Sequence, residues 1–376
     1  MSSHLISKER LANTLAIKDL SDPDNGIHAI NLVVRKVYDY LLAKKNWPKP
    51  EVRRAHPISS VTNDFDRLYF PPDSLNRLPR YTRYLDEKTI LRTHTTAMIP
   101  DILKEIQTKD IEDYSVLCPG LCYRRDVVDK KHVGEPHQMD IWRIKKGEPR
   151  LEREALIELI ESVLDATITG AKYRANEVNH PYTINGLEVE IMVNGDWLEL
   201  LECGEAHPQL LLDAGLNPEE YSGLAMGIGL DRMVMLLKGI DDIRLLRSDD
   251  PRIKQQMEHL HSYQSVSKYP PIRQDISVST SLETSEEDIC EKIQDALQED
   301  ANTVEEISIL SETPFEQLPP QAIERLGIKP NQKNLLVRIV LRSHERSLTH
   351  EEANHMRDLM YRAIDESETG GYVGLK

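Results

Sequence analysis

Two arginines and a group of carboxylates have types and spacing that could bind a nucleoside triphosphate. Arg124 lies on a predicted strand beside Asp126, and Arg232 opens a predicted helix after three closely spaced glycines. Guanidinium groups can hold phosphate oxygens, and carboxylates can hold Mg²⁺. The candidate carboxylates, on neighbouring predicted strands, are Glu188, Glu190 and Glu199. Taken singly, each feature is equally typical of a solvated surface ion pair.

The chain contains neither a GxxxxGK[ST] loop nor a GxGxxG sequence. A triphosphate would therefore bind on an antiparallel sheet rather than at a glycine-rich loop. The segment 123–142 alternates basic, acidic and imidazole groups and includes His132 and His137 on a predicted hairpin. It has too few apolar residues for a core element.

Predicted helices and strands must position these residues. A turn at 22–26 precedes a predicted helix, and an acidic amphipathic helix follows residue 150. The predicted inward faces are Ile30, Val33, Val34, Val37 and Leu41 in the first helix, and Leu156, Leu159, Ile160, Val163 and Leu164 in the second. The alternating segments 187–193 and 196–204 are predicted strands.

Composition limits the class of protein. With 376 residues, 39% hydrophobic and 29% charged, the chain has the profile of an ordinary globular protein with room for two domains. No apolar run approaches the ~18 residues needed to span a bilayer, and the N-terminus has no signal-peptide pattern. We therefore expect a cytoplasmic protein without a membrane partner. The four cysteines form no CxxC pair, which favours reduced thiols over a structural metal.

The last part of the chain begins a new pattern after a polar linker near 259–268. A strand, a helix at 285–299, strands near 307 and 335–341, and a helix at 349–366 follow one another. That order is roughly β-α-β-β-α-β, the ferredoxin-like arrangement. We predict two domains, 1–262 and 266–376.

In their order, these segments resemble the class II aminoacyl-tRNA synthetases, and within them the phenylalanyl-tRNA synthetase catalytic (alpha) subunit. The resemblance is carried by "LRTHTT" (91–96), by "PGLCYRRDVVDKKHVGEPHQMD" (119–140) as motif 2, and by "GLAMGIGLDRMVMLLKGIDDIR" (223–244) as motif 3. The last ~110 residues resemble the family's ferredoxin-fold anticodon-binding domain. The resemblance implies an α+β fold: an antiparallel-sheet catalytic domain flanked by helices, plus a small ferredoxin-like α+β domain.

The resemblance also implies roles for individual residues. Arg124 and Arg232 would be catalytic, contacting the α- and γ-phosphate of ATP. The implied ATP site adds Asp126 at the adenine edge, His132 at a phosphate, Gly229, and Glu199 as the Mg²⁺ ligand. The implied amino-acid site consists of His94, Thr96, Gln138, Asp140, His180, Tyr182, Glu205, Ala225 and Gly227.

The implied side-chain pocket departs from the family's pattern. His180 and Tyr182 replace two phenylalanines, and Glu202 and Glu205 stand where the family has small or apolar residues. A phenyl ring satisfies neither an imidazole nor a carboxylate, so these changes indicate a polar substrate, cationic or hydroxylated. The alternative is that both glutamates point away and His180 stacks like a phenylalanine.

The charge of the chain bears on whether tRNA accepts the activated amino acid. The net charge is −16, and residues 266–376 carry 12 Lys and Arg against 21 Asp and Glu, a balance of −9. Binding to tRNA must neutralise phosphates, for which Arg338, Arg342 and Arg346 could form a local stripe. We expect an enzyme that activates an amino acid with ATP and Mg²⁺ and transfers it to tRNA, acting as a monomer or homodimer.

Two alternatives stay open from the sequence. One is an adenylate-forming enzyme that passes its amino acid to a carrier protein, a small molecule or a protein side chain. The other is a non-catalytic nucleotide-binding regulator, against which Arg124 and Arg232 both argue.

Overall fold

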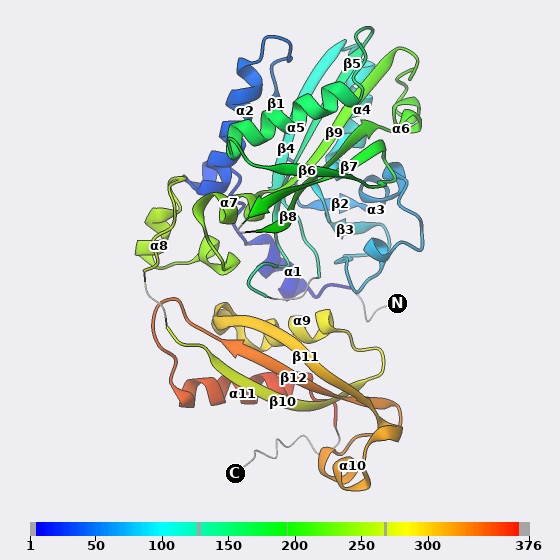
Figure 1. Cartoon of the computed structure of the whole chain (residues 1–376). Coiled ribbons are helices and arrows are strands. Elements are labelled where there is room, and N and C mark those ends of the chain that lie inside the picture. Colours follow the sequence, from blue (N-terminus) through cyan, green and yellow to red (C-terminus); the bar gives the residue numbers. More distant parts are fainter. Residues whose placement is uncertain (1–4, 126–128, 194, 267–268, 368–376) are drawn as a thin grey trace. The chain divides into compact units, whose positions relative to one another are not determined.

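The computed structural model describes residues 5–125, 129–193, 195–266 and 269–367. They form two compact units that alternate along the chain (Figure 1). The first comprises Met1–Arg124, Glu135–Ile240 and Gln255–Tyr263, and the second comprises Arg125–Gly134, Asp241–Lys254 and Gln264–Lys376. Segments 125–134 and 241–254 therefore group with the second unit, although the sequence expectation places them in the catalytic part.

A seven-stranded sheet forms the centre of the first unit, in the order β1-β4-β5-β9-β8-β7-β6. Strands β1 and β4 are parallel, and the other neighbours in this sheet are antiparallel. The strands are β1 (Glu51–Val52), β4 (Asp113–Leu121), β5 (His137–Lys146), β6 (Tyr173–Glu177), β7 (Thr183–Val193), β8 (Asp196–Ala206) and β9 (Tyr221–Gly229). This sheet confirms the predicted α+β class and the strands expected at 187–193 and 196–204.

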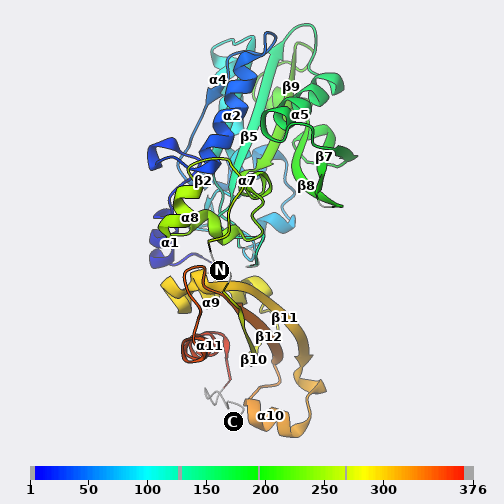
Figure 2. The same ribbon diagram turned by 60° about the vertical axis from the view of Figure 1, so that its left-hand side comes forward.

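The long helices of the first unit lie against the sheet (Figures 1 and 2). Helix α2 (Ala29–Ala43) packs on α5 (Arg153–Thr167) and on α7 (Leu230–Lys238). The predicted inward faces of α2 and α5 are confirmed, because all ten residues that the sequence assigned to them are buried. A capping box of His28 and Asn31 starts α2, and Gly239, at φ +66°, ends α7. Further elements of this unit are α1 (Lys8–Leu15), α3 (Val61–Asp64), α4 (Ile99–Thr108), α6 (Pro208–Asp213), and the paired strands β2 (Ile58–Ser60) and β3 (Thr89–Leu91). Helix α8 (Pro251–Gln256) begins in the segment 241–254, which groups with the second unit.

One face of the sheet is apolar at one end and polar at the other. At one end, apolar residues of β4, β5 and β9, such as Cys118, Trp142 and Ala225, pack with residues of α4 and α6. Toward the other end the same face carries Gln138 and Asp140. Because side chains alternate between faces of a strand, these polar residues share a side with Trp142. This end of the face is the candidate site.

The second unit has a three-stranded antiparallel sheet in the order β10-β12-β11. Its elements are β10 (Ile272–Ser281), α9 (Glu286–Leu297), β11 (Val304–Pro314), α10 (Pro320–Leu326), β12 (Gln332–Leu341) and α11 (His350–Ile364). Capping boxes at Ser285 and Thr349 start α9 and α11. The fourth strand of the expected ferredoxin-like order would fall on 368–376, outside the described residues.

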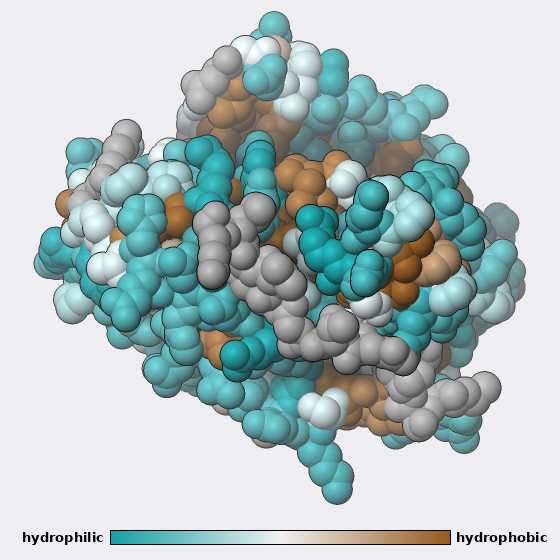
Figure 3. Space-filling view, turned by 90° about the horizontal axis from the view of Figure 1, so that it is seen from below, coloured by the Kyte–Doolittle hydropathy of each residue, from teal (hydrophilic) through white to brown (hydrophobic). Residues whose placement is uncertain are grey.

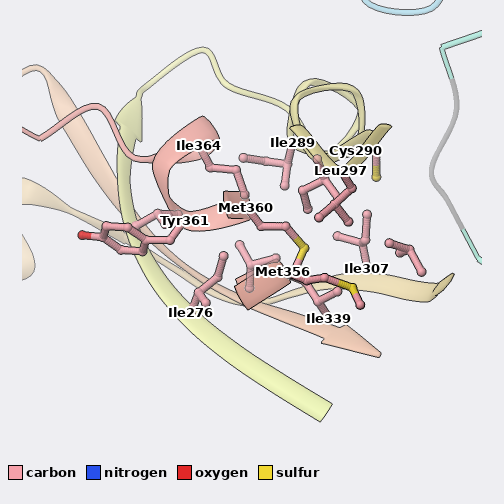
Figure 4. Packing of buried hydrophobic residues seen from close by; sticks show 14 of the residues in the cluster. Ile276, Ile289, Cys290, Leu297, Ile307, Ile339, Met356, Met360, Tyr361 and Ile364 are labelled. Atoms are coloured by element: carbon pink, nitrogen blue, oxygen red, sulfur yellow. The ribbon is translucent and has the colours of Figure 1, made fainter. Parts of the chain in front are cut away.

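Apolar side chains of α9, α11 and the sheet form the core of the second unit (Figure 4). Ile289, Ile307 and Met360 are buried within it. Among the described residues of this unit, two large hydrophobic ones, Leu282 and Leu310, remain exposed. Figure 3 shows a molecular face that is mostly hydrophilic, with hydrophobic residues in separate patches.

No helix within the described residues is long and apolar enough to cross a membrane. All four cysteines are buried.

Candidate active site

Asp140, Gly227 and Glu202 lie in one row across three neighbouring strands. Asp140 on β5 pairs with Gly227 on β9, and Gly227 pairs with Glu202 on β8. Residues directly opposite one another in an antiparallel pair project to the same side. Gly227 therefore leaves a gap between two carboxyl side chains. A Cβ at this glycine would lie 3.2 Å from Gln138 Nε2 and 4.0 Å from Asp140 Oδ1, so both groups face the gap.

A buried polar network holds Asp140 at one side of this gap. Its Oδ1 accepts a hydrogen bond from Thr95 Oγ1 at 2.8 Å, and its Oδ2 accepts one from Trp142 Nε1 at 3.2 Å. Burial raises the pKa of the Asp140 carboxyl, and the hydroxyls of Thr95 and Thr96 act against that shift. The network fixes the orientation of Asp140.

His94 offers an unused nitrogen beside this network. Its Nε2 donates to the backbone oxygen of Asp64 at 2.9 Å, and Asp64 is itself fully buried. The other ring nitrogen, Nδ1, is buried and has no hydrogen-bond partner within the described ranges. An unpaired buried polar atom costs about 1–3 kcal/mol, and a ligand that pairs with Nδ1 would remove that cost. The structure thus brings His94, Thr96, Gln138 and Asp140 to one place, and their role in binding an amino acid stays a prediction.

Arg124 lies at the end of this face, held by a hydrogen bond from its Nε to Thr93 O at 2.9 Å. Its positive charge contributes to lowering the pKa of Glu202 and acts on the Tyr182 hydroxyl, so the three groups are within electrostatic range. Arg232 is in the first turn of α7, and its Nη1 donates to Glu199 O at 2.9 Å. Gly229 directly precedes that helix and pairs with Gln138.

A β-bulge brings Glu199 to the side that Glu202 occupies. Along a regular strand, residues three apart point to opposite faces. Here the pairing of β7 with β8 skips Leu200, since Val189 pairs with Leu201 and Glu190 pairs with Glu199. The extra residue reverses the alternation.

One carboxylate oxygen of each of Glu188, Glu199 and Glu202 lies within 4.8 Å of the others. Burial and the neighbouring glutamates raise the pKa of Glu188. Carboxylate oxygens are suitable Mg²⁺ ligands, so this donor set fits the ion. Glu190 instead pairs with Arg174 and Asn176.

Three aromatic rings connect Asp140 with Glu202. Trp142 stacks on Tyr182 with ring centroids 6.3 Å apart, and Tyr182 lies 6.0 Å from the His180 ring. His180 Nε2 is 3.0 Å from Glu202 Oε2. This contact lowers the pKa of Glu202 and keeps it ionised.

Other predicted residues lie elsewhere. Glu205 is three regular strand positions beyond Glu202, pairs with Leu224, and so faces the opposite side of the sheet, where Asn185 Nδ2 donates to it at 3.0 Å. His132 belongs to the second unit, where its Nδ1 is 2.7 Å from Asp129 Oδ2. Asp126 is outside the described residues. Ala225 is buried beside Trp142 on the candidate face.

The sequence did not predict a clamp between β5 and α7, which consists of two hydrogen bonds between His137 and Asp231. Asp231 accepts hydrogen bonds from both the backbone N–H and the ring Nδ1 of His137, the latter at 3.0 Å. His137 Nε2 in turn accepts a bond from Leu20 N at 3.0 Å. His137 precedes Gln138 and Asp231 precedes Arg232, so the clamp fixes the two motifs that carry the site. The signal available in the sequence was that His137 and Asp231 each lie next to a predicted site residue.

The chain is similar in sequence to known proteins. Residues 15–257 match the family described as "tRNA synthetases class II core domain (F)". The chain is 29% identical over 351 residues to the phenylalanine–tRNA ligase, chloroplastic/mitochondrial, of Arabidopsis thaliana, covering 90% of this chain and 76% of that protein. It is 31% identical over 238 residues to the phenylalanine–tRNA ligase alpha subunit of Acaryochloris marina, covering 62% and 68%. For the alpha subunit of Clostridium beijerinckii the identity is 33% over 223 residues, covering 55% and 61%.

Proposed function

The chain belongs to the class II tRNA synthetase core domain (F) family and is an aminoacyl-tRNA ligase, and from that premise we propose that it activates its amino acid with ATP and Mg²⁺ at the face around Gly227. The observation that carries the site assignment is that Gln138 and Asp140 both face the gap at Gly227, with His94 within electrostatic range of Asp140 and Arg124 within electrostatic range of Glu202.

In the first step, the carboxylate oxygen of the amino acid attacks the α-phosphorus of ATP and pyrophosphate leaves. Negative charge builds up on the α-phosphate oxygens in the transition state, and Arg124 would stabilise it. Removing such an electrostatic contact typically costs about 3–4 kcal/mol. Arg232 would hold the γ-phosphate end.

Glu199, with Glu188 and Glu202 nearby, would hold Mg²⁺, which neutralises phosphate charge. Asp140 and Nδ1 of His94, both hydrogen-bond acceptors, would orient the ammonium group of the amino acid. In the second step, a ribose hydroxyl at the tRNA 3′ end attacks the acyl carbon and AMP leaves.

We further propose an anticodon-binding role for the second unit, in which tRNA would have to compete with internal ion pairs. Arg338 pairs with Asp275 at 2.8 Å, Arg342 with Glu305 at 2.5 Å, and Arg346 with Glu352. Because these arginines are already paired with carboxylates, we expect this unit to bind tRNA weakly. The pairs also favour the alternative, an acceptor other than tRNA. We also propose that the protein is cytoplasmic, that its domain boundary lies between residues 262 and 266, and that it acts as a monomer or homodimer.

The test is amino-acid-dependent ATP–pyrophosphate exchange in wild type, Arg124→Ala and Arg232→Ala, with circular dichroism as the control for folding. We expect exchange to fall by about two to three orders of magnitude in Arg124→Ala, and to fall in Arg232→Ala. Near wild-type exchange in either folded variant would show that the triphosphate binds elsewhere.

A further inference from the structure

We infer that Glu202, held in place by His180, is a specificity residue that selects an amino acid whose side chain carries a hydrogen-bond donor, most strongly a positively charged one. The inference rests on the proposed function, because it assigns a substrate class to the same site.

The position of Glu202 carries the argument. It shares a cross-strand row with Gly227 and Asp140, and the atoms within 4 Å of a Cβ placed at Gly227 belong to the Gln138 amide and Asp140 on one side, with none from Glu202 on the other. Neighbouring strands are roughly 4.8 Å apart, so Asp140 and Glu202 flank a gap about 10 Å wide at the backbone. A molecule that places its ammonium group at Asp140 therefore extends its side chain toward Glu202.

His180 Nε2 lies beside one carboxylate oxygen of Glu202 and not beside the other. The His180 Nε2 contact is to Oε2, and the His180 side chain is 14% exposed while that of Glu202 is 43% exposed. No hydrogen bond of Oε1 to a protein group is found within the described part of the chain. The exposed part of the carboxylate is thus available to a donor on the substrate.

A purely apolar side chain in this gap would remove water from Glu202 and return no hydrogen bond. Sites built to hydrogen-bond a polar substrate reject the apolar analogue by about 10⁴-fold. A phenyl ring could still stack on Tyr182, but stacking does not compensate a desolvated carboxylate. Glu202 thereby favours an amino acid with an amino, guanidino, imidazole or hydroxyl donor over phenylalanine.

Glu202 could instead serve only as a Mg²⁺ ligand, because its oxygen lies near those of Glu188 and Glu199. The two roles differ in what a variant changes. A specificity residue alters the ranking of amino acids, whereas a metal ligand alters the Mg²⁺ requirement for every amino acid alike.

The experiment measures kcat/KM for exchange across the twenty amino acids, with Mg²⁺ titrations, in wild type, Glu202→Gln and Glu205→Gln. Glu205 is the matched control, a carboxylate on the same strand that faces the other side of the sheet. We expect wild type to prefer a donor-bearing amino acid over phenylalanine by at least about 100-fold. Glu202→Gln should reduce that ratio by about tenfold or more, mainly through KM, while Glu205→Gln keeps it.

A wild-type preference for phenylalanine, or a Glu202→Gln effect confined to the Mg²⁺ half-saturation, would overturn the inference and leave the proposed function intact. Absence of exchange with every amino acid would count against the proposed function instead. Calorimetric titration of wild type and Glu202→Gln with lysine, arginine, histidine, tyrosine and phenylalanine then tests Glu202 directly. Tighter binding of a donor-bearing side chain that is lost in the variant supports the inference, and equal or tighter binding of phenylalanine overturns it.

Discussion

The absence of a side chain at Gly227 keeps the gap beside Gln138 and Asp140 free of a methyl group. A methyl group there would press on the Gln138 amide at 3.2 Å and enter the gap beside Asp140. Overpacking of this kind typically costs about 1–3 kcal/mol, so we expect Gly227→Ala to lower kcat/KM for amino-acid activation by roughly tenfold or more. The measurement is exchange kinetics together with the melting temperature. Unchanged kinetics in a folded variant would place the amino acid elsewhere.

The buried cysteines make a second prediction for single residues. Burial raises the pKa of Cys122 and of Cys203 to about 12. Since the thiolate is the nucleophile, both should resist a disulfide reagent at pH 8 in the folded protein. All four thiols should react after unfolding in guanidinium. Rapid modification of either residue in the native protein, identified by peptide mapping, would contradict this burial.

At the level of elements, the pair of His137 and Asp231 fixes β5 against α7. Asp231→Asn replaces one of the two acceptor oxygens with an NH₂ group, which then faces one of the two donors of His137. We expect a loss of about 1–3 kcal/mol in the free energy of unfolding, and a lower rate of exchange because Arg232 is the next residue. Urea unfolding and exchange kinetics measure the two effects. Wild-type values for both would show that the clamp does not position Arg232.

The regular elements were predictable from the sequence, whereas the irregular ones were not. Alternation of apolar residues was enough to predict β7 and β8, and helical spacing was enough for α2 and α5. The same alternation put Glu199 and Glu202 on opposite faces, because it contains no signal for the bulge at Leu200. Glu205 was expected at the site from its aligned position, but regular pairing beyond the bulge turns it to the other side. Regular alternation thus turns Glu205 away from the gap, and the bulge at Leu200 turns Glu199 to the side of Glu202.

At the scale of the whole molecule, a buried charge network should make the second unit sensitive to acid. Burial raises the pKa of Asp242, but hydrogen bonds from His344 and Arg244 outweigh burial, so the net pKa lies below its ordinary value. A lowered pKa contributes stability that is present above the unfolded-state value of about 4 and is lost as the pH falls through the folded-state value.

We therefore expect unfolding of the second unit to become easier below about pH 4. Asp242→Asn should be destabilised at pH 7, by about 1–3 kcal/mol, and should show a weaker dependence on pH in the acid range. Thermal melts between pH 2.5 and 7 make the comparison. If wild type and variant lost stability in parallel across that range, Asp242 would not be the group responsible.

The acidic balance of the second unit predicts weak binding of tRNA. Its candidate phosphate-binding arginines are already paired, so few counterions would be released when tRNA binds. We expect the logarithm of the binding constant to fall with the logarithm of salt concentration at a slope of about three or less. A slope equivalent to six or more phosphates would show that the ion pairs open readily for tRNA.

The central claim is that the face around Gly227 serves an aminoacyl-tRNA ligase. The most direct measurement is attachment of radiolabelled amino acid to tRNA, using the amino acid that gives the strongest exchange. We predict ATP-dependent label in precipitated tRNA that mild alkali releases, and its loss in Arg124→Ala. Strong pyrophosphate exchange with no label on tRNA, under conditions in which a control synthetase charges the same preparation, would contradict the account and indicate a different acceptor.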